Sequence, residues 1–508
     1  MMSKKYSIKD EEIIDLNGLK IVVTANELEA SEHRGISAYT KNLVKTLSNA
    51  GAEVWLLTEF YTPYTSKKFN NKKINFVNLS YILEFLSKGF TKKPEQLNTL
   101  LKNFSLLRYF LNIKDYILKL FRSFRLKAYR NRKLKFIRNI QYDSPYSRLD
   151  RMDYLKYITG FISARKIYYS SLIRIILRIK SPVKIDLKGF DVLITACPLN
   201  IRPINIKKYI QTIHDLIPLE HSPYPYMDSI FLNRLNETIN SKRLFISRTT
   251  KSKYNLFFDI NSNHLDYQKD KSNTNFDKVA IQPPTLRISN QILISKSNDL
   301  VFNPQNINQK KQNYVEVLEK KNLYKFQYIL FNASVDPRKN LSLILNAYNQ
   351  SNLYKKNIRL CICGKIPNNK ESKSILSVIK SSNGIISTGY VSEEIKSQLY
   401  LYALATINTS LIEGFGLPVF DASCLGLKSY VSNCFSHNEI HDLFDFSDFV
   451  NMIKLNNLQG WIKSLNSISP IEADFEEIAQ YRISRYKLFE KRIEKEFLHS
   501  LNSLIKNN

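Results

Sequence analysis

The stretch from Ser410 to Ala422 reads Ser-Leu-Ile-Glu-Gly-Phe-Gly-Leu-Pro-Val-Phe-Asp-Ala and gives the clearest indication of the fold. Just before it, the short apolar segment Ala405–Asn408 predicts a buried strand. Gly414 and Gly416 interrupt regular structure, and Pro418 suits the first turn of a helix. The stretch therefore predicts a strand, a tight glycine loop and a helix.

Two carboxylates flank this loop, with Glu413 at its entrance and Asp421 on the opening turn of the helix. The free N–H groups of Gly416 and Leu417, together with the helix dipole, form a site for an anion. A diphosphate can lie on these donors, with Glu413 directed toward sugar hydroxyls and Asp421 toward a ribose. A glycine turn beside a helix start is more often purely structural, but two acids at this spacing are a more specific signal.

The spacing of Glu413 and Asp421 resembles the E-x7-E signature of retaining, GT-B-fold glycosyltransferases of family 4, the group 1 transferases. The resemblance implies that Glu413 is catalytic. It also implies donor contacts for the loop residues Gly414, Phe415, Gly416 and Leu417 and for Asp421. This chain departs from the family at Asp421, which is one methylene shorter than the second glutamate that holds the nucleotide ribose.

Length and composition indicate a folded protein of two or three domains, with 508 residues, 44% hydrophobic and 24% charged. The N-terminal residues lack the apolar core of a signal peptide, and no run of about 18 apolar residues predicts a membrane span. The five cysteines are scattered and odd in number, and Cys361 and Cys363 alternate within an apolar run that predicts a strand. We therefore expect a cytoplasmic protein.

The formal charge of +30 is concentrated in residues 101–185, which hold 21 Lys and Arg against 4 Asp and Glu. Segments 113–124 and 168–179 predict basic amphipathic helices, the second with Ile176 on its apolar face and Arg174 on its basic side. Two interpretations stay open: the helices lie on an anionic membrane surface, or their apolar faces pack on the protein and the charges are solvated. We do not expect nucleic acid as the partner.

The first half begins with a βαβ unit: strand 19–25, a helix over 36–50 and strand 53–58. The loop before the helix resembles the family's first glycine loop, which implies that Gly35 lies near the donor phosphate. Ser37 replaces the usual second glycine. The alternative is a structural turn with no ligand.

Further strands are expected at 190–195 and 209–213, and His214 follows the second at its carboxyl end, where ligands bind in open parallel sheets. A histidine there can donate to a sugar hydroxyl or a phosphate oxygen. The sequence Thr-Ile-His-Asp-Leu-Ile-Pro resembles the family's motif in the first domain, which implies a catalytic, donor-contacting role for His214. Ser247 is expected to cap the helix that follows it.

The second half opens with strand 326–332 and a loop, residues 333–340, that resembles the family's G-T-x-x-P-R-K-N loop. Asn340 and Ser392 are expected to cap the helices that follow them. A final strand is expected at 428–433. The resemblance implies that a basic pair neutralises the donor phosphates and that the backbone of a turn at residues 388–392 meets the nucleobase. It assigns donor contacts to Ser334, Arg338, Lys339, Gly364, Tyr390 and Val391, with Lys339 also catalytic.

Together these features predict an α/β protein with the GT-B arrangement, two Rossmann-like domains whose parallel sheets face an interdomain cleft. The expected divisions are residues 1–286 with a basic helical insertion at about 65–187, a linker at 287–322, a second domain at 323–480, and a C-terminal helix at 481–508 that packs back on the first domain.

The implied reaction moves a hexose from a nucleotide-diphosphate sugar, GDP-mannose-like or a UDP-sugar, to a glycan or lipid-linked acceptor with retention of configuration. We expect this reaction in cell-envelope polysaccharide or lipopolysaccharide synthesis, at the inner face of a membrane. No cofactor or metal is expected. The alternatives are a catalytically weakened GT-B protein, a GT-B epimerase or phosphorylase, and a basic protein that binds membranes or nucleic acid.

Overall fold

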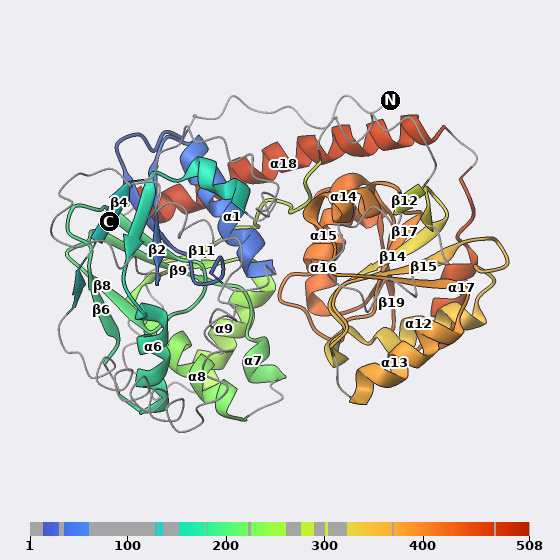
Figure 1. Cartoon of the computed structure of the whole chain (residues 1–508), viewed down its shortest axis with the longest axis horizontal. Coiled ribbons are helices and arrows are strands. Elements are labelled where there is room, and N and C mark those ends of the chain that lie inside the picture. The colour runs from blue at the N-terminus through green and yellow to red at the C-terminus, as the bar shows by residue number, and fades with distance from the viewer. Residues whose placement is uncertain are drawn as a thin grey trace, which may run out of the picture.

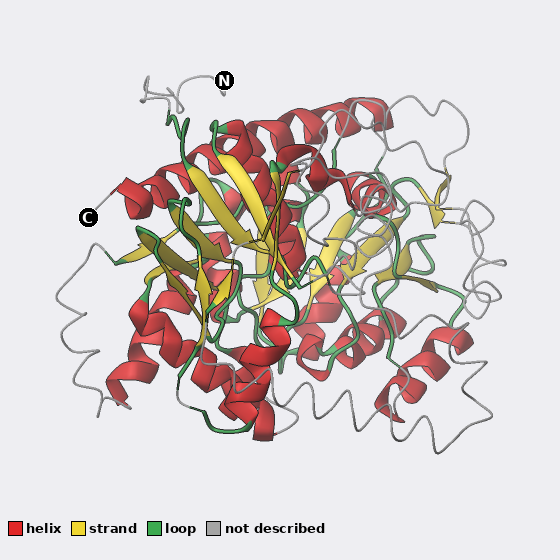
Figure 2. Cartoon of the chain, turned by 60° about the vertical axis from the view of Figure 1, so that its left-hand side comes forward, coloured by secondary structure: helices red, strands yellow, loops and turns green. Residues whose placement is uncertain are grey.

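The computed structural model describes residues 14–29, 35–59, 128–130, 132–135, 152–179, 181–221, 225–260, 276–288, 300–302, 323–367, 370–471 and 474–506. These residues form two lobes, each built around a parallel sheet (Figure 1). Helices flank the strands of both lobes (Figure 2).

The sheet of the first lobe has eight strands in the order β11-β10-β9-β7-β1-β2-β5-β4, and only the edge strand β4 is antiparallel to its neighbour. Its strands are β1 (Lys20–Thr24), β2 (Glu53–Thr58), β4 (Arg132–Lys135), β5 (Gly160–Ser163), β7 (Val192–Thr195), β9 (Lys208–Ile213), β10 (Lys242–Phe245) and β11 (Asp277–Val279). A smaller parallel sheet is formed by β3 (Tyr129–Arg130), β6 (Val183–Asp186) and β8 (Ile201–Ile204).

The helices of the first lobe present apolar residues to the sheet at helical spacing, as in α1, which buries Tyr39, Leu43 and Leu47. The α-helices are α1 (Gly35–Asn49), α6 (Ile167–Ile176), α7 (Ile217–Glu220), α8 (Pro225–Glu237) and α9 (Arg248–Ile260), with 3-10 turns η1 (Asp153–Tyr157) and η2 (Thr238–Asn240). The expected cap at Ser247 is confirmed, because its Oγ accepts the N–H of Thr250 at 3.0 Å.

The sheet of the second lobe has six parallel strands in the order β16-β15-β14-β17-β18-β19. They are β14 (Tyr328–Asn332), β15 (Arg359–Cys363), β16 (Ile385–Gly389), β17 (Ala405–Asn408), β18 (Ser429–Ser432) and β19 (Val450–Ile453). Strand order reverses between β14 and β17, and such a switch point opens a ligand crevice at the carboxyl ends of the strands. The loops carrying Lys339 and Glu413 leave the sheet at this point.

The helices of the second lobe are α12 (Leu341–Gln350), α13 (Lys370–Ser381), α14 (Glu393–Leu401), α15 (Leu417–Leu425), α16 (Phe435–His441), α17 (Leu458–Asn466) and α18 (Phe475–Lys506), with 3-10 turns η5 (Pro337–Lys339) and η6 (Phe446–Asp448). Ser392 caps α14 as expected, accepting the N–H of Ile395. The expected cap at Asn340 is wrong: Asn340 has φ +48°, and its side chain makes no capping bond to α12 within the described chain.

Helix α18 runs along both lobes (Figure 1). Near its start, Arg482 donates to the carbonyls of Leu401 and Ala403 in the second lobe at 2.6 and 2.8 Å. Farther along, Glu490 pairs with Lys45 of α1 at 2.9 Å. This one helix therefore ties the two lobes together.

The structure differs from the expected division of the chain in three places. The described part of the insertion at 65–187 contains the strands β3 to β6, and β5 pairs with β2 in the main sheet. The linker at 287–322 contains β12 (Leu300–Phe302), which pairs with β13 (Leu323–Tyr324). The strand at 428–433 is not the last of the second sheet, because β19 follows it. The helix expected at 113–124 lies outside the described residues.

The expected division of the segment 168–179 into an apolar and a basic face is wrong at two positions, Arg174 and Ile176. Arg174 is buried, and its guanidinium donates to the carbonyls of Ser181 and Pro182 at 2.8 and 3.1 Å. Ile176 is 55% exposed. Because the following turn supplies acceptors for the guanidinium, the helix packs on the lobe with its arginine inward. Among the described residues, no helix is long and apolar enough to cross a membrane.

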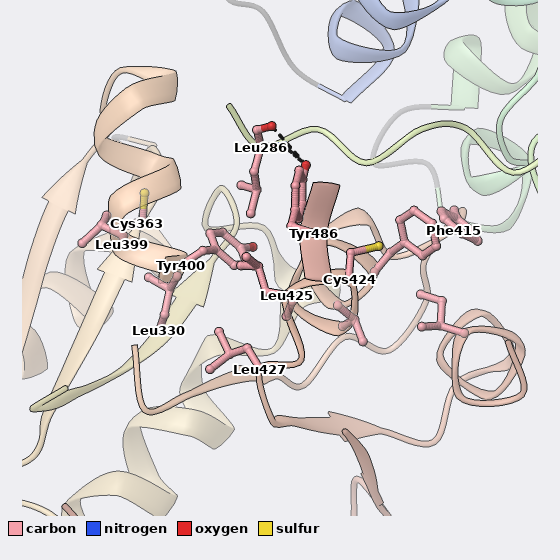
Figure 3. Packing of buried hydrophobic residues seen from close by; sticks show 14 of the residues in the cluster. Leu286, Leu330, Cys363, Leu399, Tyr400, Phe415, Cys424, Leu425, Leu427 and Tyr486 are labelled. Atoms are coloured by element: carbon pink, nitrogen blue, oxygen red, sulfur yellow. Dashed lines mark hydrogen bonds between the residues drawn. The ribbon is translucent and has the colours of Figure 1, made fainter. Parts of the chain in front are cut away.

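The core of the second lobe extends from its sheet to α15 and α18 (Figure 3). Cys361 and Cys363 lie buried in β15, as the apolar alternation predicts. All five cysteines are described, and none forms a disulfide there. The hydroxyl of Tyr486 on α18 accepts the N–H of Leu286 at 2.6 Å and donates to its carbonyl at 3.0 Å. These bonds hold residues 280–288, the crossover segment that follows β11, against the second lobe.

Candidate functional site

The glycine loop between β17 and α15 has the conformation that its sequence predicts. Gly416 is the N-cap of α15 with φ +93°, a region that favours glycine. Pro418 lies in the first turn, where its missing N–H costs no helix hydrogen bond. A Cβ atom on Gly416 would lie 3.2 Å from Ile440 and 3.3 Å from His437, so the backbone approaches α16 closely.

The structure brings Glu413 and Lys339 together in an ion pair between the glycine loop and the η5 turn. Their side chains are only 9% and 15% exposed. Ser410 Oγ donates to the same carboxylate oxygen at 2.7 Å. Burial acts to raise the pKa of Glu413, but the attraction of Lys339 and these hydrogen bonds outweigh it and hold the pKa below its ordinary value. Glu413 is therefore an ionised carboxylate at neutral pH.

Arg338 faces a different partner from its neighbour Lys339. Its guanidinium pairs with Asp336 of the same turn, Nε to Oδ1 at 3.0 Å, and its carbonyl accepts the N–H of Leu411 at 2.7 Å. The second bond fixes the η5 turn to the glycine loop, but the guanidinium lies on Asp336 and not on Glu413.

Gly364 supports the same edge of the sheet through its backbone. It has φ +147°, and a Cβ atom there would lie 2.0 Å from the carbonyl oxygen of Ala333. Only glycine fits this close approach, which fixes the loop that contains Ser334. Gly364, a predicted donor contact, is therefore also required to be glycine for a structural reason.

His214 lies at the carboxyl end of β9, in the first lobe, and is buried. Its Nε2 lies 2.7 Å from the carbonyl oxygen of Ala196, and since a carbonyl only accepts, Nε2 carries the proton. The ring of Tyr39 packs edge-on at 4.7 Å between centroids. Burial lowers the pKa of His214 to about 4, so at neutral pH the ring is uncharged and Nδ1 is an acceptor. A donor role for the ring nitrogens, as the sequence predicts, therefore does not fit this arrangement.

The two lobes meet at the glycine loop. A Cβ atom on Gly414 would lie 3.1 Å from the carbonyl oxygen of His214 and 2.9 Å from Cβ of Asp215. A Cβ atom on Gly35 would lie 3.6 Å from the side chain of Leu417. The structure therefore brings Gly35, His214 and the loop residues to one place, with contributions from both sheets.

The carboxylate of Asp421 is hydrogen-bonded to Thr285, which is not one of the predicted site residues. Asp421 is buried, and its two carboxylate oxygens accept the N–H and the hydroxyl of Thr285 at 2.7 and 2.5 Å. Burial raises the pKa of Asp421 to about 6, with the Thr285 bonds opposing this. A carboxylate engaged in this way is a tether between α15 and the crossover segment, whereas the sequence predicts a ribose contact.

Three other predicted residues of the second lobe differ in how far they are buried. The Phe415 ring is buried against Phe420, 4.9 Å between centroids, so only its backbone is available to a ligand. Tyr390 and Val391 follow β16, which is separated from β14 by β15 in the sheet. Tyr390 is 51% exposed, and Val391 is buried.

Sequence reasoning missed the role of α16, whose residues surround the glycine loop. Ser436 Oγ donates to the carbonyls of Glu413 and Gly414 at 2.8 and 3.1 Å. His437 is fully buried, its Nδ1 donates to the carbonyl of Ser432 at 2.8 Å, and its Nε2 has no partner among the described residues. Burial lowers the pKa of His437, so the ring is neutral beside Glu413. The only sequence signal is the polar Ser-His-Asn-Glu segment at residues 436–439, which follows the strand expected at 428–433.

No group of three or more His, Cys, Asp or Glu in the described residues is arranged to hold a metal ion. A hollow of about 620 Å³ lies elsewhere, at the amino ends of β1, β7 and β9. Its lining includes Lys20, Phe190, Asp191 and Lys207, and it contains no predicted site residue within the described chain.

Parts of this chain are similar to known proteins. Residues 316–443 match the sequence profile of the family described as glycosyl transferases group 1. Among solved structures, TarM is similar over 97% of this chain and 99% of its own, at 10% identity and a TM-score of 0.50. Sucrose-phosphate synthase from Thermosynechococcus elongatus is similar over 96% and 99%, at 10% identity and a TM-score of 0.49.

HepE from Anabaena, solved in complex with UDP and glucose, is similar over 96% of this chain and 100% of its own, at 11% identity and a TM-score of 0.46. A search of curated proteins returns no match. Residues 316–443 are thus similar to a glycosyl transferases group 1 domain, in a chain with the GT-B fold.

Proposed function

We propose that this protein is a retaining glycosyltransferase that moves a hexose from a nucleotide-diphosphate sugar to a hydroxyl group of an acceptor. The observation that carries the proposal is the buried Lys339–Glu413 ion pair at the switch point of the second sheet, which faces His214 of the first lobe across Gly414. The match of residues 316–443 to the group 1 profile supports it.

In the proposed reaction, the leaving diphosphate and the sugar next to it develop opposite charges. As the bond to the sugar breaks, the nucleoside diphosphate gains negative charge and the sugar gains oxocarbenium-like positive charge. Lys339 and the N–H groups at the start of α15 stabilise the leaving diphosphate. Glu413, ionised by its low pKa, stabilises the sugar and orients its hydroxyls. His214, neutral and buried, accepts a hydrogen bond from the sugar at Nδ1.

The proposal also names a class of donor and a class of acceptor. The P-R-K-N-type loop favours a mannose-like donor by analogy, with a UDP-sugar as the other choice. Arg338 reaches the diphosphate by leaving Asp336, and its 26% exposed side chain lies at the surface of the turn. We propose a glycan or lipid-linked acceptor of cell-envelope synthesis, met at the cytoplasmic surface of a membrane through the basic residues of 101–185.

The test is calorimetric titration with a panel of nucleotide sugars, followed by turnover assays with and without acceptor alcohols. Lys339→Ala is expected to lose about 2–4 kcal/mol of transition-state stabilisation, measured as kcat/KM. The matched control is Lys253→Ala, which removes a lysine paired with Glu220 on the outside of the first lobe. Absence of donor binding by the wild-type protein contradicts the enzymatic proposal, and equal kcat/KM for the two variants contradicts the role of Lys339.

A second candidate is a catalytically weakened GT-B protein, and the observation that favours it is the engagement of Asp421 by Thr285. This candidate predicts donor binding by calorimetry without transfer to any acceptor.

If transfer is observed, anomeric analysis of the product by NMR separates retention from inversion.

A further inference from the structure

Glu439, on α16 of the second lobe, holds the start of a helix in the first lobe. One carboxylate oxygen accepts the N–H of Arg248 at 2.7 Å, and the other accepts the N–H of Thr249 at 2.9 Å. These are the first two residues of α9, whose N–H groups have no partner within their own helix. A carboxylate at the positive end of a 13-residue helix is favourable, so this contact joins the lobes directly.

The first turn of α9 is also attached to His214. Thr250 Oγ1 donates to the carbonyl of His214 at 2.9 Å. Ser247 accepts the N–H of Thr250 at 3.0 Å, and its Oγ lies 3.5 Å from the carbonyl oxygen of Gly414. The turn that Glu439 holds is therefore the one that lies between His214 and the glycine loop.

Helix α16 is attached in the same way to the other half of the site. Three residues before Glu439, Ser436 donates to the carbonyls of Glu413 and Gly414. Between them, His437 packs against Gly416. Glu439 thus connects two short segments, one fixed to His214 and the other fixed to Glu413.

We propose that Glu439 is a positioning residue, which clamps α9 to α16 and so sets His214 against the Glu413 loop when the lobes are closed. This inference rests on the proposed glycosyltransferase function. Glu439 itself need not touch the donor. Its effect on the reaction comes from the alignment of groups on separate lobes, and a misplacement of about 1 Å in such an alignment costs up to about 100-fold in rate.

The experiment compares Glu439→Ala and Glu439→Gln with the wild-type protein. We expect Glu439→Ala to lower kcat about 10- to 100-fold while the donor dissociation constant changes less than about twofold, because the donor is held by the second lobe. Glu439→Gln keeps one acceptor oxygen and is expected to lie between the two. The matched control is Glu220→Ala, which removes the carboxylate that pairs with Lys253 of α9 within the first lobe. It is expected to leave kcat unchanged.

Small-angle X-ray scattering supplies a readout that does not depend on activity. We expect a larger radius of gyration for Glu439→Ala and an unchanged one for Glu220→Ala. Wild-type kcat in Glu439→Ala overturns the proposal, as does an unchanged radius of gyration. Loss of donor affinity overturns it too, because Glu439 would then be a donor contact.

The two proposals fail in distinguishable ways. If the wild-type protein binds no nucleotide sugar, the proposed function fails, and the scattering comparison still decides whether Glu439 clamps the lobes. If Glu439→Ala does not fold, Glu439→Gln gives the same comparison with a smaller expected change.

Discussion

Replacing Lys339 by methionine leaves Glu413 as a buried carboxylate without its cation, and this is the sharpest test of the site. Both side chains are at most 15% exposed, so water compensates little for the lost partner. Breaking a buried ion pair by removing one member costs about 3–5 kcal/mol in the free energy of unfolding. Ser410 still donates to the carboxylate, which places the expectation near the lower end, at about 3 kcal/mol at pH 8.

The pH dependence of the variant follows from the pKa of Glu413. In the wild-type protein this pKa lies below its unfolded value, so the ionised group stabilises the fold above that value, and the contribution is lost as pH falls through the folded pKa. Without Lys339, burial dominates and the folded pKa lies above the unfolded one. The folded variant then binds more protons, and its stability declines as pH rises through the interval between the two pKa values.

The assay is urea unfolding at pH 5, 6, 7 and 8. We expect the difference between wild type and Lys339→Met to grow with pH and to shrink when Glu413→Gln is added, because the double variant buries no charge. Lys253→Met is the control, since its partner Glu220 is 32% exposed and such pairs contribute less than about 1 kcal/mol. The reasoning is refuted if the two lysine variants lose equal stability at pH 8. It is also refuted if Lys339→Met loses as much stability at pH 5 as at pH 8.

Three further predictions concern single positions. The wild-type protein is expected to lose on the order of 2 kcal/mol of stability as pH rises from 4 to 6, because the folded pKa of Asp421, about 6, lies above the unfolded value of 3.8. Asp421→Asn is expected to remove this loss, and urea midpoints across this range measure it. His214→Gln is expected to lower kcat about 10- to 100-fold without changing the pH–rate profile between pH 6 and 8, because a pKa of about 4 keeps the ring neutral there. Gly364→Ala is expected to destabilise the protein by about 3 kcal/mol or more in thermal unfolding, whereas Gly18→Ala, at φ +81° with open space around it, costs about 1 kcal/mol.

The elements that the sequence predicts well are those whose signal is local. Glu53–Thr58 and Ala405–Asn408 are strands with the expected bounds, because each is a short run of buried residues between turn residues. The Lys339–Glu413 contact can also be predicted, from the order of the strands. Both residues come after strands that neighbour each other at the switch point, so their loops leave the sheet side by side.

The features that the sequence does not predict depend on partners distant in the chain. Thr285 is 136 residues from Asp421, and nothing in the spacing of Glu413 and Asp421 indicates that Asp421 is hydrogen-bonded to Thr285. Arg248 is 191 residues from Glu439, on the other lobe. Strand β19 is missed because Val450–Ile453 has four residues, of which Asn451 and Met452 are exposed, so its pattern is too short to recognise.

The ion pair also constrains how a donor enters the site. In the structure Lys339 is already neutralised by Glu413, so a diphosphate competes with this carboxylate for the ammonium group. A diphosphate carries more negative charge than one carboxylate and also receives the N–H groups at the start of α15, so it is the stronger partner for Lys339. Once Lys339 turns to the diphosphate, Glu413 keeps Ser410 as a donor and is free to face the sugar. The same exchange therefore places the cation on the leaving group and the anion on the developing positive charge, which is the charge separation that the proposed reaction requires.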